Sequence, residues 1–485
     1  MIHNPIIRGF NPDPSIAFDG ERYIIAVSTF EYYPGIALYT SEDLSDWRYE
    51  TSVMTDANGF SLEGVKNSSG LYAATIRFHN GRYYMVTTNK NGLGNFVSHS
   101  ESLSGPWSEP FPIYPEGIDP SLCFLQDGRC FYTQNGKGGI YGAFINPDNG
   151  ILEEPLRKIS PGLSGYATEA PHIYEKDGLY YLIFAEGGTE YGHHEIAGRA
   201  EDIYGPYELG QKPILSHTER KNHDIQATGH ADLLEMEDGS WIAVFLGIRM
   251  PGRPLLHNLG RETFMAEVSW IDGWPVIGND GKVEIEEPSA IETSTEKPVY
   301  FSFTDDIDSS PLLRVRSRGK ELYERGNGSL VIHSRDSLSK EKGEPALLLL
   351  RQTEFETVFS SELRTDSSLT GKAGVTAFYN SDYHADLYLE WRAGKLHAVF
   401  RRKIHDLECI VSDSEVEAKK PAVRLEIRTD REWYIFYADG KEMGRASIAS
   451  FATEGTMYMT FTGTLLGIFS EDGDGCFEKG FGFEK

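Results

Sequence analysis

The stretch NGRYYM at residues 80–85 decides the fold, because it joins a tight Asn-Gly turn to an aromatic strand. The same pattern, Asp or Asn before Gly and then an apolar, aromatic strand, occurs four more times. These other turns are Asp19-Gly20, Asp127-Gly128, Asp177-Gly178 and Asp238-Gly239. Asp-Gly and Asn-Gly pairs between apolar runs are strong hairpin signals, since a type I′ turn needs positive φ at both residues.

The spacing of these hairpins indicates the architecture. They return about every 50 residues, which is typical of propeller blades of four strands each. Five returns predict a five-bladed β-propeller, and we place this domain at residues 1–290.

A second domain follows a change in composition. Residues 284–298 are rich in Glu, Ser, Thr and Pro and lack a clear period, as expected of a linker. Beyond them, alternating strands such as Leu387–Trp391 and Trp433–Tyr437 predict a β-sandwich at residues 299–485. The whole chain is therefore expected to be all-β.

Composition limits the function. The chain has 485 residues and a formal net charge of −27, which argues against a nucleic-acid partner. No apolar run approaches the length of a transmembrane helix, and residues 1–5 do not resemble a signal peptide. The four cysteines match no zinc spacing. We therefore expect a cytoplasmic protein without a membrane partner or an organic cofactor.

One polar residue per blade occupies an equivalent position. Counting back nine residues from the last four hairpin glycines, and seven from Gly20, gives five residues. They are Asp13, Tyr72, Asp119, Glu169 and His230. The innermost strand of each blade lines the channel of a propeller, so we expect these side chains to converge on the axis. Leaving charges unpaired there is costly, which favours a functional site over chance placement.

Asp13 has a backbone suited to catalysis. It lies in the stretch NPDPS at residues 11–15, where each proline fixes its own φ and keeps the preceding residue extended. An Asp-Pro turn that caps its own backbone is the alternative. Nearby carboxyls cannot share one pKa, so one can serve as acid and another as base. Glycoside hydrolysis needs such a pair, and placement on different blades favours the wider separation of inverting enzymes.

Several motifs resemble glycoside hydrolase family 43, in its branch of β-xylosidases and α-L-arabinofuranosidases. The similar stretches are residues 9–16, 28–35, 117–122, 167–172, 229–233 and 259–263. They run in order over essentially the whole propeller. The region after residue 298 is similar to the concanavalin-like C-terminal sandwich of that branch.

The resemblance implies a role for each of the three carboxylates. Asp13 would be the general base, Glu169 the general acid, and Asp119 the residue that tunes and orients the acid. Arg261 would contact the terminal sugar, although an ion pair with Glu262 is the structural alternative.

Further substrate contacts are implied in the same way. Phe30 and Tyr72 would form walls of the sugar pocket, and Phe30 could equally be a plain core residue. Phe461 lies in a stretch that resembles a loop near the mouth of the site. His193 is a candidate rim residue, with an ordinary polar loop position as the alternative.

His230 would lie deep on the axis, where relatives hold a water or a calcium ion. A satisfied structural histidine is the equal alternative, and calcium prefers oxygen ligands. Relatives are often oligomers, so a homo-oligomer is a further expectation.

We therefore predict an exo-acting, inverting glycoside hydrolase that releases terminal non-reducing α-L-arabinofuranosyl or β-D-xylosyl residues from hemicellulose-derived oligosaccharides. Many family members have Trp-Ala-Pro where this chain has Tyr72-Ala73-Ala74, and this difference favours the arabinofuranoside. The alternative is a non-catalytic carbohydrate-binding propeller, which would not need an acid–base pair.

Overall fold

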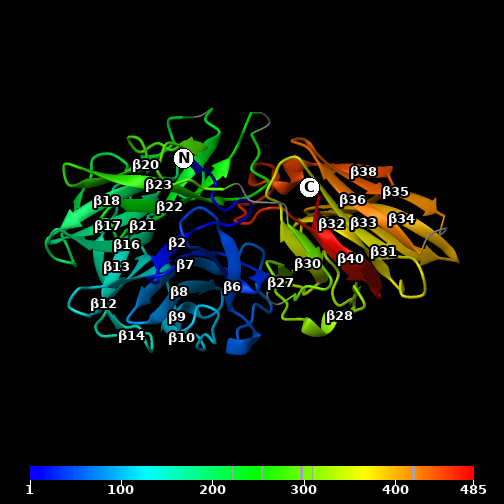
Figure 1. The fold of residues 1–485 in the computed structure, drawn as a ribbon, viewed down its shortest axis with the longest axis horizontal. Helices are drawn as coiled ribbons and strands as arrows, with labels where there is room; N and C mark the ends of the chain where they lie inside the picture. The colour runs from blue at the N-terminus through cyan, green and yellow to red at the C-terminus, as the bar shows by residue number, and fades with distance from the viewer. Residues whose placement is uncertain (221, 253–254, 295–298, 308–309, 418–420, 485) are drawn as a thin grey trace.

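The computed structural model describes residues 1–484 except 221, 253–254, 295–298, 308–309 and 418–420. Two β-rich bodies lie side by side, with the propeller coloured blue to green and the sandwich yellow to red (Figure 1). Within the described residues, helical structure consists of four short 3₁₀ turns: η1 (Asp56–Asn58), η2 (Lys320–Leu322), η3 (Ile448–Phe451) and η4 (Thr453–Gly455). The expectation of an all-β chain is confirmed.

Five antiparallel sheets form the propeller, each numbered outward from its innermost strand. The first two sheets contain β2 (Ser15–Phe18), β3 (Tyr23–Val27), β5 (Gly35–Ser41) and β6 (Arg48–Met54), then β7 (Gly70–His79), β8 (Arg82–Lys90), β9 (Gly94–Ser100) and β10 (Phe111–Tyr114). The third contains β11 (Ile118–Phe124), β12 (Cys130–Gly136), β13 (Gly139–Asn146), β14 (Ile151–Leu152) and β15 (Arg157–Ser160).

The last two sheets complete the ring of blades. The fourth contains β16 (Glu169–Lys176), β17 (Leu179–Glu186), β18 (His194–Ala200), β19 (Glu208–Leu209) and β20 (Leu215–Ser216). The fifth contains β21 (Ile225–Glu235), β22 (Trp241–Arg249), β23 (Glu262–Ile271) and β24 (Trp274–Ile277). The innermost strands contact one another in sequence, and β21 returns to β2. The prediction of five blades is confirmed.

The N-terminal segment closes this ring. Strand β1 (Ile2–His3) pairs with β25 (Glu286–Glu287), which follows the last blade. The Asn4 amide donates to the carbonyl of Met265 at 3.0 Å, and its Oδ1 accepts the Met265 N–H at 2.9 Å. The first and last segments of the propeller are therefore bonded together beside the fifth blade.

The predicted hairpin turns differ in detail. Both residues have positive φ at Asn80-Gly81 and Asp177-Gly178, as a type I′ turn requires. At Asp19, Asp127 and Asp238 only the following glycine has positive φ. There the Asp side chain instead accepts a backbone N–H two residues on, as Asp127 does from Arg129 at 3.0 Å. These three turns are therefore longer Asx-type loops, and the expectation of a type I′ turn at all five was wrong.

Two stacked sheets form the second domain. The six-stranded sheet contains β30 (Ala346–Arg351), β39 (Leu465–Glu471), β32 (Lys372–Asn380), β33 (Tyr383–Arg392), β34 (Lys395–Ile404) and β35 (Leu407–Val416). The eight-stranded sheet contains β26 (Tyr300–Ser302), β28 (Tyr323–Gly326), β29 (Ser329–Ile332), β40 (Gly475–Phe483), β31 (Thr357–Arg364), β36 (Ala422–Thr429), β37 (Trp433–Ala438) and β38 (Lys441–Ser447).

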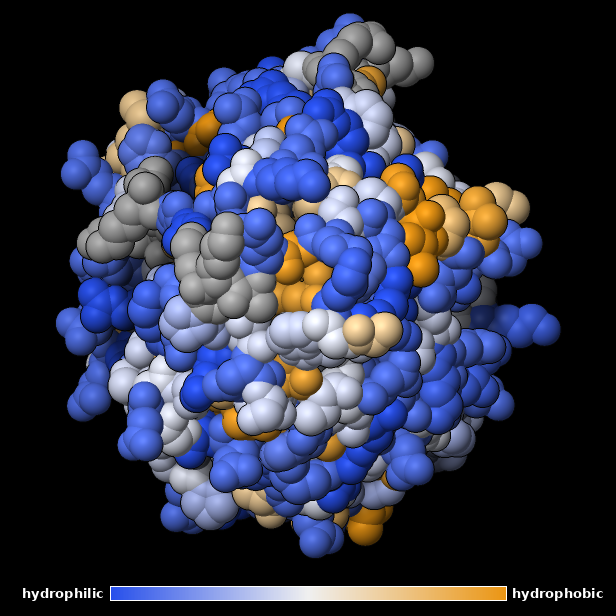
Figure 2. Space-filling model, turned by 90° about the vertical axis from the view of Figure 1, so that its right-hand side faces the viewer, coloured by the Kyte–Doolittle hydropathy of each residue, from blue (hydrophilic) through white to orange (hydrophobic). Residues whose placement is uncertain are grey.

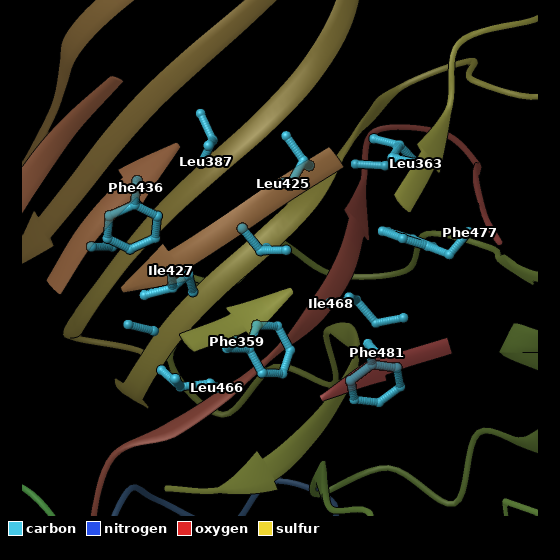
Figure 3. Close-up of a cluster of buried hydrophobic side chains, with 14 of the residues drawn as sticks. Phe359, Leu363, Leu387, Leu425, Ile427, Phe436, Leu466, Ile468, Phe477 and Phe481 are labelled. Carbon is cyan, nitrogen blue, oxygen red and sulfur yellow. The ribbon is translucent and has the colours of Figure 1, made fainter. Parts of the chain in front are cut away.

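Side chains from the facing sheets interdigitate as the sandwich core. Phe359, Leu425 and Phe481 from one sheet meet Leu387 and Ile468 from the other (Figure 3). Alternation along each strand sends these residues inward, which is how two sheets bury one common core.

A short β pairing is one of several contacts between the two domains, which also share a buried hydrophobic cluster. Strand β4 (Tyr32–Tyr33), inside the first blade, pairs with β27 (Arg314–Val315) from the sandwich segment. The fully buried Arg316 follows β27, and its guanidinium donates to the carbonyl of Gly343 at 3.1 Å and to Asn67 at 2.6 Å. These bonds attach the sandwich to the first blade and to the segment that joins the first two blades.

The end of the sandwich that points away from the propeller is mainly hydrophilic, with small hydrophobic patches (Figure 2). In the described part of the chain, no helix has the length and apolar character needed to cross a membrane.

Candidate active site

A small pocket opens on the propeller axis where the inner strands begin. Its lining comes from all five blades and from the sandwich: Asp13, Phe30, Tyr72, Ala73, Ile118, Asp119, Glu169, Thr189, His230, Arg261 and Phe461. The five residues at equivalent blade positions are therefore brought together. Larger hollows exist elsewhere on the molecule, but only this one gathers these five groups among the described residues.

Irregular backbone aims these side chains at the axis. Asp13, Asp119 and His230 have positive φ values of 54°, 53° and 56°, so the expectation of an extended backbone at Asp13 was wrong. The inner strands also shift register around Asp119, Glu169 and His230. Bulges beside functional sites redirect side chains, and non-glycine residues with positive φ are costly elsewhere. The strained backbone at these positions therefore directs the side chains toward the propeller axis.

Bonds between neighbouring blades fix the carboxylate positions. Thr75 Oγ1 donates to the carbonyl of Pro120, next to Asp119, at 2.9 Å. Thr133 Oγ1 donates to the carbonyl of Pro171, two residues after Glu169, at 3.1 Å. The second blade thus holds the strand that carries Asp119, and the third blade holds the strand that carries Glu169.

Asp13 is held as a carboxylate. It is buried, and its Oδ1 lies 2.5 Å from Arg261 Nη1, while Ser28 donates to its Oδ2 at 2.7 Å. Burial alone would raise the pKa of Asp13, but Arg261, His230 and Ser28 outweigh it and hold the pKa below its usual value. An ionised carboxylate at neutral pH is the state that a general base needs.

Asp119 is in the opposite electrostatic state. Burial, followed by repulsion from Glu169 and Asp13, raises the pKa of Asp119 well above its usual value. Its Oδ2 accepts the backbone N–H of Ala170 at 3.2 Å, directly beside Glu169. The different environments therefore move the pKa values of Asp13 and Asp119 in opposite directions. Asp119 is also hydrogen-bonded to the backbone next to Glu169.

Arg261 points into the site. Its Nη1 also donates to Thr189 Oγ1 at 3.0 Å, and its Nη2 donates to the carbonyl of Phe461 at 3.1 Å. Glu262 instead forms a bidentate ion pair with Arg249, with distances of 2.7 and 2.8 Å. The alternative of an Arg261–Glu262 surface pair is therefore wrong.

Three aromatic rings wall one side of the pocket. Phe30 lies 5.2 Å from Tyr72 and 5.7 Å from Phe461, measured between ring centroids. Ser68 ties two of them together, because its carbonyl accepts the Tyr72 hydroxyl at 3.2 Å and its Oγ accepts the Phe461 N–H at 3.1 Å. Phe30 is nearly fully buried, so it serves both as core and as wall.

His193 does not lie at the rim. Its side chain is fully buried, and Nε2 lies 3.4 Å from Glu169 Oε1. The expectation of a rim position was wrong, because the loop closes on itself between Gly187 and Gly192 and the His193 ring packs against Gly229.

His230 offers little to a metal ion. Its Nδ1 lies 3.9 Å from Asp13 Oδ1, and burial lowers its pKa against the attraction of Asp13. Across the described residues, no group of three or more His, Cys, Asp or Glu side chains could hold a metal ion. These residues do not fit a directly coordinated calcium ion, so no step below depends on one.

Several site residues were not predicted from the sequence. Thr189, Ser28 and Ser68 contact the site, and the sequence motifs assign a role to none of them. Ser28 is the second residue before Phe30 and could have been found through that motif. Ser68 lies outside every motif, so only the folded chain reveals its contacts.

Carboxyls in unlike environments around one small pocket are the acid–base arrangement that a glycoside hydrolase needs. Comparison with known families gives the particular one. The model of glycosyl hydrolases family 43 matches residues 2–275, and that of the beta xylosidase C-terminal concanavalin A-like domain matches residues 314–480. The chain belongs to glycosyl hydrolases family 43.

Similar proteins cover both domains. The chain is 32% identical to the non-reducing end alpha-L-arabinofuranosidase BoGH43B of Bacteroides ovatus, over 96% of this chain and 90% of that protein. It is 30% identical to a putative beta-xylosidase of Escherichia coli, over 98% of each chain. A solved xylan beta-1,4-xylosidase from Bacillus halodurans superposes with a TM-score of 0.91 at 28% identity, covering all of both chains.

Proposed function

We propose that this glycosidase removes single terminal non-reducing α-L-arabinofuranosyl or β-D-xylosyl residues from hemicellulose-derived oligosaccharides, with inversion at the anomeric carbon. One observation carries the proposal. Asp13 and Glu169 come from the first and fourth blades, which are not neighbours in the ring, and both line the same small pocket. Positions on non-adjacent blades suit a pair of carboxyls that admits a water between them.

Each carboxyl has one step in this mechanism. Asp13, ionised at neutral pH, takes a proton from a water as that water's oxygen bonds to the anomeric carbon. Glu169 gives its proton to the glycosidic oxygen as the bond between that oxygen and the anomeric carbon breaks. Asp119, through Ala170, holds the backbone that carries Glu169.

The pocket itself supports exo action. Phe461, from the sandwich, meets Phe30 and Tyr72 and lines the pocket from outside the propeller. A channel blocked in this way accepts the end of a chain rather than its middle. Arg261 lines the pocket, and its Nη1 can donate to a hydroxyl of that terminal sugar in place of its hydrogen bond to Thr189.

The sugar preference rests on the wall. Tyr72 and Ala73 stand where many family members carry a Trp-Ala pair, and both line the pocket. We expect the arabinofuranoside to be the better substrate. Relatives with both kinds of name match this chain, including a xylosidase/arabinosidase of Butyrivibrio fibrisolvens.

Hydrolysis of paired aryl substrates tests the proposal. The α-L-arabinofuranoside and β-D-xyloside should be cleaved, and NMR of the first-formed product should show the inverted anomer. Glu169→Gln should lower kcat by about 10²–10⁴-fold on a substrate with a poor leaving group, because the proton donor is lost. Retained configuration would contradict the mechanism. A chelator arm tests calcium separately, since loss of activity there would assign a metal that these residues alone do not hold.

A further inference from the structure

His193 lies beneath the proposed acid in a fully enclosed position. Its side chain is 0% exposed, and Nε2 faces Glu169 Oε1 at 3.4 Å. A Cβ on Gly229 would lie 2.7 Å from both Nδ1 and Cε1, so the ring fills the space that this glycine leaves. The imidazole therefore cannot turn without moving the innermost strand of the fifth blade.

The surroundings of the ring decide which nitrogen carries the proton. Nδ1 lies 3.3 Å from the carbonyl of Ala227, a residue with a positive φ of 52°. A carbonyl oxygen can only accept, so the ring proton belongs on Nδ1. Nε2 then presents a lone pair, and within the described part of the chain it has no hydrogen-bond partner. A buried nitrogen left in this state needs an explanation.

His217 has the same contact between Nδ1 and a backbone carbonyl, and its Nε2 also accepts a hydrogen bond. Its Nδ1 lies 2.9 Å from the carbonyl of Ile225, and its Nε2 accepts the backbone N–H of Val283 at 3.1 Å. Burial lowers the pKa of His217 to about 4, so it stays neutral. At His193 the place of that backbone donor is taken by Glu169.

We propose that His193 is a positioning residue for the acid, whose Nε2 accepts a hydrogen bond from the protonated Glu169 carboxyl and holds the other oxygen toward the glycosidic oxygen. This inference rests on the proposed role of Glu169. The 3.4 Å separation is long in the free enzyme, and such contacts often tighten only when substrate is bound.

In the part of the chain that the structure describes, no other side chain holds the Glu169 carboxyl in this way. Asp119 acts through the neighbouring Ala170 N–H, and Glu195 accepts the backbone N–H of Ala231 at 3.1 Å. His230 bonds no carboxyl more closely than 3.9 Å. Of the described groups around the acid, His193 is therefore the one whose free lone pair is directed at its carboxyl.

Leaving-group dependence tests the role. His193→Leu should lower kcat about tenfold on an aryl glycoside with a poor leaving group. It should change kcat by less than about twofold on one with a good leaving group, which departs without a proton. KM should stay nearly constant for both. His193→Gln, whose amide oxygen can accept at the position of Nε2, should restore most of the lost rate.

His217→Gln is the matched control, because His217 is similarly buried and, among the described residues, its ring bonds backbone groups rather than Asp13, Asp119 or Glu169. It should affect both substrates alike. An equal loss on both substrates in His193→Leu, or no loss on either, would overturn the proposal and leave His193 as a packing residue. Thermal unfolding of each variant shows whether it is folded, and His193→Gln still decides the question if His193→Leu does not fold.

A direct measurement does not depend on turnover. In ¹⁵N-histidine NMR, the signal absent from His193→Gln should show a protonated Nδ1 and a bare Nε2. A proton on Nε2 would refute the inference even if the enzyme is fully active. Conversely, a wild-type chain that cleaves neither substrate, or a Glu169→Gln variant with undiminished activity, would refute the proposed function, whatever the NMR shows.

Discussion

Asp119 is repelled by both of the other carboxyls in the pocket, Asp13 and Glu169. Burial, Glu169 and Asp13 all favour its protonated form, while the Ala170 N–H favours the ionised one. The folded state therefore binds this proton more tightly than the unfolded chain does. Stability contributed by the group is present at low pH and is lost as pH rises above about 4, the ordinary pKa of an aspartate.

Asp119→Asn should separate stability from activity. The amide carries no charge and can still accept from Ala170, so the variant should melt at a higher temperature than the wild type at pH 7. The gain should shrink toward pH 4, where the wild-type carboxyl is protonated in both states. Calorimetry at the two pH values, with kcat measured alongside, checks this. We expect kcat to fall by at least tenfold, a trade-off common at active sites. A variant that is less stable at pH 7 than at pH 4, relative to wild type, would contradict it.

Residue-scale prediction from the sequence succeeded where a position repeats. Asp13, Tyr72, Asp119, Glu169 and His230 sit at one place in five similar units, so a count from each turn finds them. It failed for His193, because its position depends on a loop folding against Gly229, far along the chain. No local pattern encodes that contact.

At the scale of elements, the loop before β39 completes the pocket from the other domain. A Cβ on Gly463 would lie 2.3 Å from the carbonyl of Leu259, and one on Gly260 would lie 2.9 Å from Gly463 Cα. The two backbones touch because neither residue has a side chain. This contact sets how far Phe461 reaches toward Arg261.

Gly463→Ala should loosen this loop. Backbone cannot yield as a side chain can, so we expect the loop to move outward and the Phe461 carbonyl to leave Arg261. KM should rise about tenfold, and the free energy of unfolding should fall by about 1–3 kcal/mol. Gly326→Ala is the control, because nothing lies within 4 Å of the added Cβ. Unchanged KM in Gly463→Ala would show that the loop does not shape the pocket.

Some contacts between strands and loops could not be predicted from the sequence. The hairpin pattern located the first two strands of every blade, but the pairing of β4 with β27 joins segments almost 300 residues apart. Two-residue strands carry no period to detect. The motif at residues 461–463 was placed near the mouth of the site only through family resemblance.

At the scale of the whole molecule, one buried arginine links the domains. Arg316 N donates to the carbonyl of Glu31 at 2.9 Å, and its guanidinium attracts the Glu31 carboxyl. Burial raises the pKa of Glu31 from 4.5 to about 7 in spite of that attraction. Stability from this group is therefore greatest at low pH and is lost as pH rises from about 4.5 through 7.

Arg316→Met should destabilise the protein more at pH 8 than at pH 5. At pH 8 Glu31 would be left as a buried charge without a cation, at a cost of about 3–5 kcal/mol, whereas at pH 5 it can hold a proton. Denaturant unfolding at both pH values measures the difference. Arg48→Met, an exposed arginine beside Asp46, should change stability by less than about 0.5 kcal/mol at either pH. An equal loss at both pH values would remove Glu31 from the explanation.

The closure of the propeller by its first residues also orders events during synthesis. Asp13 is synthesised well before Arg261 and the partner strand of β1, which come from the fifth blade and just beyond it, and before Phe461, which comes from the sandwich. At about 5–20 residues per second, on the order of a minute passes between the synthesis of Asp13 and that of Phe461. A nascent chain therefore lacks a complete pocket until the stretch around Phe461 has been synthesised.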